Sequence, residues 1–154
     1  MTDADLLKGL PAAEVEQVLA LGQRMLLTSG AELFHLGDTA DSIYLVSRGR
    51  IRLTLPMQVR NRQEDVLVEE QSSGQSVGWS ALTPPYRFTL TASAEIETEV
   101  IALRRDALNS YFAAHPDTGY AVSLNLAGII GQRLQLFQAM WLREIQRMVE
   151  SRCA

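Results

Sequence analysis

The residues best suited to binding chemistry lie in the segment 74–92, where a glycine turn is followed by an arginine. Gly78 precedes a predicted short helix over residues 79–82, and backbone N–H groups at such a turn point outward together, forming a small anion cradle. The forked guanidinium of Arg87 could close over the same anion. The segment equally suits a structural loop in which Trp79 fills the core and Arg87 pairs with a surface carboxylate.

Catalytic and metal chemistry find little support in the remaining residues. The chain holds two histidines, His35 and His115, which are far apart in sequence, and a single cysteine, Cys153. A metal centre needs several convergent ligands, and one cysteine excludes both a disulfide framework and a zinc site built on thiolates. We therefore expect neither an enzyme nor a metal site.

Strand signals surround the glycine turn from about residue 25 to residue 104. Runs rich in Val, Ile, Leu and Thr alternate with glycine and proline, the pattern of an all-β domain. Gly49 is predicted to sit in a hairpin turn between two of these strands. Residues 60–65 are expected to form a polar tip, with the next strand over residues 66–70. Short helices are predicted over residues 3–8 and 12–22.

The pattern becomes helical after residue 104. A short helix is expected to end near Pro116, and one long helix is predicted over about residues 118–152. Its apolar residues approximate a heptad seam, which favours a partner helix. We expect residues 118–132 to pack on the chain's own β domain and the rest to pair with the same helix of a second subunit. The residues of this seam are Ile130, Leu134, Phe137, Trp141, Ile145 and Met148.

Composition sets the class of protein. The 154 residues carry a net charge of −4, so a basic nucleic-acid-binding surface is not expected. No apolar run approaches the about 18 residues of a membrane span, and the acidic start does not resemble a signal peptide. These features predict a single-domain protein of the cytoplasm.

The segments 34–55 and 74–92 together resemble the cyclic-nucleotide-binding domain of the catabolite-activator and fumarate-nitrate-regulator superfamily. The matching residues are Gly37-Asp38, the strand Ile43 to Val46, and Gly49 before an alternating strand. The segment 74–92 is similar to the family's phosphate-binding cassette, and the likeness extends over roughly residues 12–150. It implies a mainly β fold, a double-stranded β-roll with flanking helices and a long dimerisation helix. The implied divisions are amino-terminal helices over 1–24, the roll over 25–104, and carboxy-terminal helices over 105–154.

The resemblance also implies a ligand, cyclic AMP or cyclic GMP. The family places a glutamate after the cassette glycine for the ribose and an arginine on the cyclic phosphate. Here Trp79 follows Gly78, and an alignment on Thr89 puts Tyr86 at the arginine position with Arg87 one residue later. The binding residues this implies are Gly78, Trp79, Ser80, Ala81, Tyr86, Arg87 and Thr89. Two alternatives are a sensor of a cyclic dinucleotide and a ligand-free protein-interaction module of the same fold.

In this family ligand binding orders the cassette and moves the hinge between the β-roll and the last helix. A partner then recognises the new position of the helix. The expectation for this chain is therefore a regulatory sensor that forms a homodimer. Regulators of this class carry a helix-turn-helix domain after the long helix, and the sequence given shows none. We therefore do not expect this chain to bind DNA.

Overall fold

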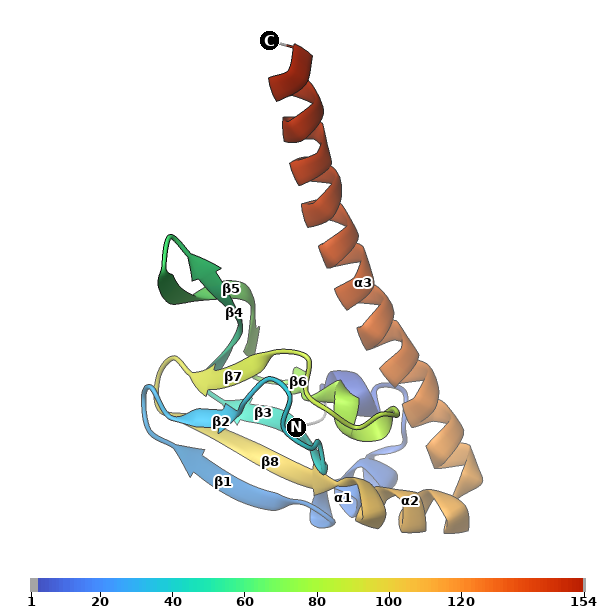
Figure 1. Cartoon of the computed structure of the whole chain (residues 1–154). Helices are drawn as coiled ribbons and strands as arrows, with labels where there is room; N and C mark the ends of the chain where they lie inside the picture. The colour runs from blue at the N-terminus through green and yellow to red at the C-terminus, as the bar shows by residue number, and fades with distance from the viewer. Residues whose placement is uncertain (1–2, 154) are drawn as a thin grey trace.

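The computed structural model describes residues 3–153, which form eight strands in two antiparallel sheets (Figure 1). One sheet has the strand order β1-β8-β3-β6 and the other β2-β7-β4-β5. The strands are β1 (Gln23–Leu27), β2 (Glu32–Phe34), β3 (Ser42–Arg48), β4 (Arg50–Val59), β5 (Arg62–Ser72), β6 (Ser76–Val77), β7 (Thr91–Ala94) and β8 (Thr98–Arg104).

Helices flank the strands on both sides in the sequence. The short helix η1 (Asp5–Leu7) and α1 (Ala12–Ala20) precede β1, and η2 (Trp79–Leu82) lies between β6 and β7. After β8 the chain forms α2 (Arg105–Ala114) and α3 (Pro116–Cys153). The predicted mainly β roll with flanking helices and a long last helix is therefore confirmed.

The core lies between the two sheets because their strands alternate apolar and polar side chains. Ile51 and Leu53 of β4 are buried while Arg52 between them is half-exposed. Gly49 links β3 to β4 with a φ of 99°, and a Cβ atom there would collide with Thr98 Oγ1. Only glycine fits this turn, but the predicted hairpin was wrong, because β3 and β4 belong to different sheets and do not pair with each other.

The β4–β5 hairpin is longer than expected. Its turn is formed by Arg60 and Asn61 alone, both with positive φ, and the strands pair from Val59↔Arg62 onward. The prediction of a polar tip over residues 60–65 was wrong, because two residues in left-handed conformation complete the turn, as in type I′ hairpins. The hairpin therefore projects beyond the roll on the same side as α3 (Figure 1).

The first half of α3 packs on the rest of the chain, and its second half projects away from the roll (Figure 1). Thr118 and Val122 are each 1% exposed, and the Asn125 side-chain amide donates to the carbonyls of Leu6 and Lys8. Residues 118–132 therefore pack on the chain itself, as predicted, but mainly on η1 and α2 rather than on the β strands. Although α3 has 38 residues, no helix within residues 3–153 carries an apolar stretch long enough to cross a membrane.

Candidate functional site

Within the cassette segment, the chain turns at a left-handed Gly78, directly after β6. Its φ of 84° turns the chain into η2, in which Ser80 and Ala81 are buried. A Cβ atom at Gly78 would lie 3.0 Å from Cε1 of Phe88, whose ring stacks on Phe34 with centroids 3.7 Å apart. Aromatic packing occupies the space beside Gly78. The left-handed backbone and this packing together account for glycine at position 78.

Tyr86 and Arg87 are adjacent in the chain but contact different neighbours. Tyr86 has a φ of 58°, and its ring lies under the guanidinium of Arg105 at 3.9 Å from the centroid. Arg87 is exposed and donates from Nη1 to the carbonyl of Gly37 at 3.0 Å. Arg87 therefore binds the 37–40 loop rather than a surface carboxylate, and its exposure leaves it accessible from solvent.

Of the other predicted site residues, Trp79 is half-buried in η2 and Thr89 is exposed. The structure brings Gly78, Trp79, Ser80 and Ala81 together in one turn and leaves Thr89 outside it. Trp79 is thus not the fully buried core residue that the structural alternative described.

Arg105, which sequence reasoning did not select, joins the cassette to the helices. Its Nη1 donates to the carbonyl of Ala40 at 2.7 Å and to that of Ala81 at 2.9 Å. It also lies 3.6 Å from a carboxylate oxygen of Asp41. A pocket of about 120 Å³ lies beside it, lined by Leu82, Tyr86, Arg105, Asn109, Phe112, Val122, Ser123 and Leu126. One cavity wall therefore combines the cassette, α2 and α3.

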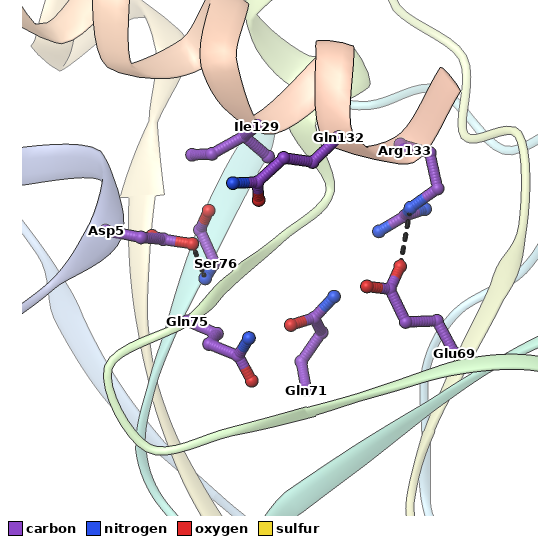
Figure 2. A pocket seen from close by; sticks show the side chains of 8 residues that line it. All are labelled: Asp5, Glu69, Gln71, Gln75, Ser76, Ile129, Gln132 and Arg133. Carbon is purple, nitrogen blue, oxygen red and sulfur yellow. Dashed lines mark hydrogen bonds and ion pairs between the residues drawn. The ribbon is translucent and has the colours of Figure 1, made fainter. Parts of the chain in front are cut away.

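A second cavity, of about 40 Å³, lies between β5, β6, η1 and α3 (Figure 2). Polar side chains surround it almost completely: Asp5, Glu69, Gln71, Gln75, Ser76, Gln132 and Arg133, with Ile129 as the apolar member. Arg133 is 9% exposed, and its Nε lies 2.6 Å from Oε2 of Glu69. The two side chains form an ion pair.

Three oxygens around this polar cavity are buried without a hydrogen-bond partner in the part of the chain that the structure describes. They are Asp5 Oδ1, Ser76 Oγ and Glu69 Oε2, of which Glu69 Oε2 has the ion-pair contact with Arg133. A buried polar atom without a partner costs about 1–3 kcal/mol, so the cavity suits an occupant that donates N–H or O–H groups. Its volume accommodates a few water molecules at about 10–15 Å³ each.

Burial raises the pKa of Asp5 above its ordinary value, and the hydrogen bond from the Ser76 backbone N–H opposes the shift. The backbone N–H of Ser76 donates to Asp5 Oδ2 at 3.1 Å, and the N–H of Asp5 donates to the carbonyl of Gly74. Asp5 therefore fastens η1 to the start of the cassette segment.

The two histidines lie apart from both cavities. His35 is exposed, and its Nδ1 lies 2.8 Å from Glu32, a hydrogen bond that raises the pKa of His35. His115 caps the end of α2 and stacks on Tyr111. Within residues 3–153, no group of three or more His, Cys, Asp or Glu side chains is placed to hold a metal ion.

Residues 24–115 match the family model of the cyclic nucleotide-binding domain. The chain belongs to this family. Family membership gives it a regulatory, ligand-binding role. The cyclic AMP receptor protein of Thermus thermophilus is 27% identical over 135 residues, covering 88% of this chain and 59% of that protein. The crystal structure of the Thermus thermophilus catabolite activator protein superposes with a TM-score of 0.78 at 26% identity, covering 93% of this chain and 63% of that chain.

The chain is also similar to parts of two proteins with other names. Glutaminase 1 of Bradyrhizobium diazoefficiens is 26% identical over 138 residues, covering 87% of this chain and 21% of that protein. The c-di-GMP-responsive regulator CLP of Xanthomonas campestris shares the fold, with a TM-score of 0.74 at 18% identity over 86% of this chain and 64% of that chain. The chain thus spans less than two thirds of each of these proteins.

Proposed function

We propose that this chain is a regulatory sensor that binds a cyclic nucleotide or a related phosphorylated small molecule at the cassette and signals through α3. The observation that supports this most directly is the position of Arg105. It bonds to the cassette carbonyl of Ala81, stacks on Tyr86, and lines a pocket with Val122 of α3. A ligand that moved the cassette would therefore act on the first half of α3.

The proposed anion-binding group is Arg87, whose exposed guanidinium makes one hydrogen bond, to Gly37, in the part of the chain described. An arginine can bind a phosphate through two parallel N–H bonds, and Arg87 keeps further N–H groups for that purpose. The 27%-identical relative is by name a cyclic AMP receptor, which makes cyclic AMP the first ligand to test.

Thermal unfolding with cyclic AMP, cyclic GMP and cyclic dinucleotides at millimolar concentration tests the proposal. A ligand at 100 times its Kd adds about 2.7 kcal/mol, which raises the Tm by several degrees. The shift should vanish in Arg87→Ala and persist in Arg60→Ala, a matched exposed arginine at the hairpin tip. No shift with any of these ligands would overturn the sensor proposal.

A ligand-free interaction module is the second candidate. Two observations favour it: the stacked Phe34 and Phe88 rings fill the space beside Gly78, and Trp79 stands where the family carries a carboxylate. In that case no nucleotide should shift the unfolding curve, either of the wild-type protein or of Arg87→Ala. Either way, we propose a regulatory and not a catalytic role in the cytoplasm.

We further propose that the chain forms a homodimer through α3. Leu134 is 58% exposed, Phe137 37% and Trp141 67%, so the second half of the helix presents an apolar stripe to solvent. Such a stripe at heptad spacing is buried when two helices pair. Sedimentation velocity should show a dimer, and the double substitution Phe137→Lys, Trp141→Lys should give a folded monomer. A native monomer at all concentrations would contradict this.

A further inference from the structure

The polar cavity between η1, β5, β6 and α3 contains a carboxylate without a counter-charge. Figure 2 shows Asp5 and Ser76 at one end of the cavity and Glu69 and Arg133 at the other. The charge of Glu69 is paired with that of Arg133. None of the ion pairs within residues 3–153 involves Asp5. Among the described residues, the Asp5 end of the cavity therefore has no paired positive charge.

Two oxygen atoms at this end, Asp5 Oδ1 and Ser76 Oγ, are buried without a hydrogen-bond partner in the described residues. Ser76 is 4% exposed, so a partner for its hydroxyl has to come from inside the cavity. A buried carboxylate is stable when it is both hydrogen-bonded and paired with an opposite charge, and water supplies only the hydrogen bonds. A cation with N–H donors supplies both. An ammonium group carries three such donors, which suits a site with a few acceptors.

A surface cleft of about 240 Å³ adjoins this end of the cavity, between η1 and α3. It shares Asp5, Ile129 and Gln132 with the cavity, so the two spaces are neighbours. Gly128 forms part of the cleft wall, and a Cβ atom there would meet nothing within 4 Å. The cleft therefore has room for a short carbon chain whose charged end lies in the polar cavity.

We propose that this cavity binds the ammonium group of a small primary amine, with the carbon chain of the amine in the cleft between η1 and α3. The ammonium group would donate to Asp5 Oδ1 and Ser76 Oγ and neutralise the carboxylate. The site is separate from Arg87, the group proposed above for a phosphate, and it needs no nucleotide. Since η1, the cassette segment and α3 all line the cavity, a bound amine would add a contact among these three elements.

Nuclear magnetic resonance of the nitrogen-15-labelled protein tests the site, with methylammonium chloride and n-butylammonium chloride as probes. At about 1–100 mM, a range that suits ligands this small, both probes should shift the amide signals of Asp5 and Ser76 along saturable curves. Tetramethylammonium has the charge without N–H donors, and sodium chloride matches the ionic strength, so neither should produce these shifts. No shift with either amine would overturn the proposal, as would equal shifts with tetramethylammonium or sodium.

Ser76→Ala distinguishes a binding role from a structural role of this hydroxyl. The variant removes an oxygen that has no partner in the described residues, so without amine it should be at least as stable as wild type. Its Kd for n-butylammonium should nevertheless rise by at least about fivefold, because one hydrogen bond to a charged group is lost. An unchanged Kd in this variant would overturn the proposal, even if Asp5 variants failed to fold.

Asp5→Asn removes the charge that the ammonium group would pair with. Its Kd for n-butylammonium should rise by at least about tenfold. Asp65→Asn, which removes an exposed carboxylate of β5, is the matched control and should leave this Kd unchanged. Arg87→Ala should also leave it unchanged. Loss of amine binding in Arg87→Ala would overturn this separate site, and the sensor proposal would still be decided by the nucleotide experiment.

Discussion

Gly78 has two separate reasons to be glycine, its left-handed backbone and the aromatic ring beside it. Its φ is 84°, and an added Cβ would approach Phe88 to 3.0 Å. Gly37 has a similar φ of 91° but nothing within 4 Å of the position of a Cβ. A comparison of Gly78 with Gly37 therefore separates the cost of a left-handed backbone from the cost of displacing a packed ring.

We expect Gly78→Ala to destabilise the protein by about 1 kcal/mol more than Gly37→Ala does. Both variants carry the strain of a left-handed alanine, about 1–2 kcal/mol, and only the first also displaces a core ring. Urea unfolding of the two variants measures the difference in the free energy of unfolding. Equal losses in the free energy of unfolding would show that the Phe34 and Phe88 rings move aside without destabilising the protein.

Asp5 predicts a pH dependence whose sign follows from burial. Because its pKa is raised in the folded state, the native protein holds a proton that the unfolded chain releases, so stability falls as pH rises between the two pKa values. Asp5→Asn keeps an acceptor for the Ser76 N–H and removes the buried charge. At neutral pH this variant should be at least as stable as wild type, with a flatter profile as the pH rises above the ordinary aspartate pKa of 3.8. If Asp5→Asn leaves the pH profile of stability unchanged, Asp5 does not contribute to that profile.

At the scale of elements, Arg133 and Glu69 form the one ion pair between α3 and the sheets in the described residues. Breaking a buried pair leaves a charge without its partner, which costs more than removing both groups. Because Glu69 is 31% exposed, we expect Arg133→Met to cost about 1–3 kcal/mol, and the double variant Arg133→Met, Glu69→Met to recover part of it. Thermal unfolding of the double-mutant cycle measures the coupling; strictly additive losses would mean that the pair contributes no net stability.

Cys153 lies in the last turn of α3 and is exposed, so it reports the direction of helix pairing. In a parallel α3 dimer both copies of Cys153 lie at the same end of the helix pair, and in an antiparallel dimer they lie at opposite ends. Cys153 follows the seam residue Met148 by five positions and so lies off the seam, which calls for a bifunctional thiol crosslinker rather than a direct disulfide. The crosslinker should give a covalent dimer on a denaturing gel, and Phe137→Lys, Trp141→Lys should prevent it at equal concentration. A dimer by sedimentation that gives no such product would indicate antiparallel pairing.

At the scale of the whole molecule, local sequence patterns predicted the strands and helices but not the contacts between elements distant in sequence. Alternation over 51–55 and the glycine at 49 were enough for the β4 strand and its turn, because both signals lie within a few residues. The hairpin end was missed since Arg60 and Asn61 form the turn without a glycine. Arg105 and Arg133 were missed because their partners, Ala81 and Glu69, are distant in sequence.

The cassette shows the same limit. Its turn and short helix were predicted from Gly78 and the residues that follow, and the structure has both. The sequence shows that Tyr86 stands at the family's arginine position and Arg87 one residue later. Which groups these two side chains contact depends on neighbours that only the fold supplies. Tyr86 lies against Arg105, and Arg87 bonds to Gly37. The binding roles assigned to these residues stay predictions until a ligand is measured.

The unbroken course of α3 makes it a mechanical lever. The helix continues past Arg133, its buried contact with β5, to Cys153, and these twenty positions rise about 30 Å at 1.5 Å each. A tilt of about 5° at Arg133 would displace the far end by roughly 3 Å, comparable to the length of a hydrogen bond. A rearrangement too small to alter the roll visibly would therefore be amplified, at the tip of the helix, into one that makes or breaks individual contacts.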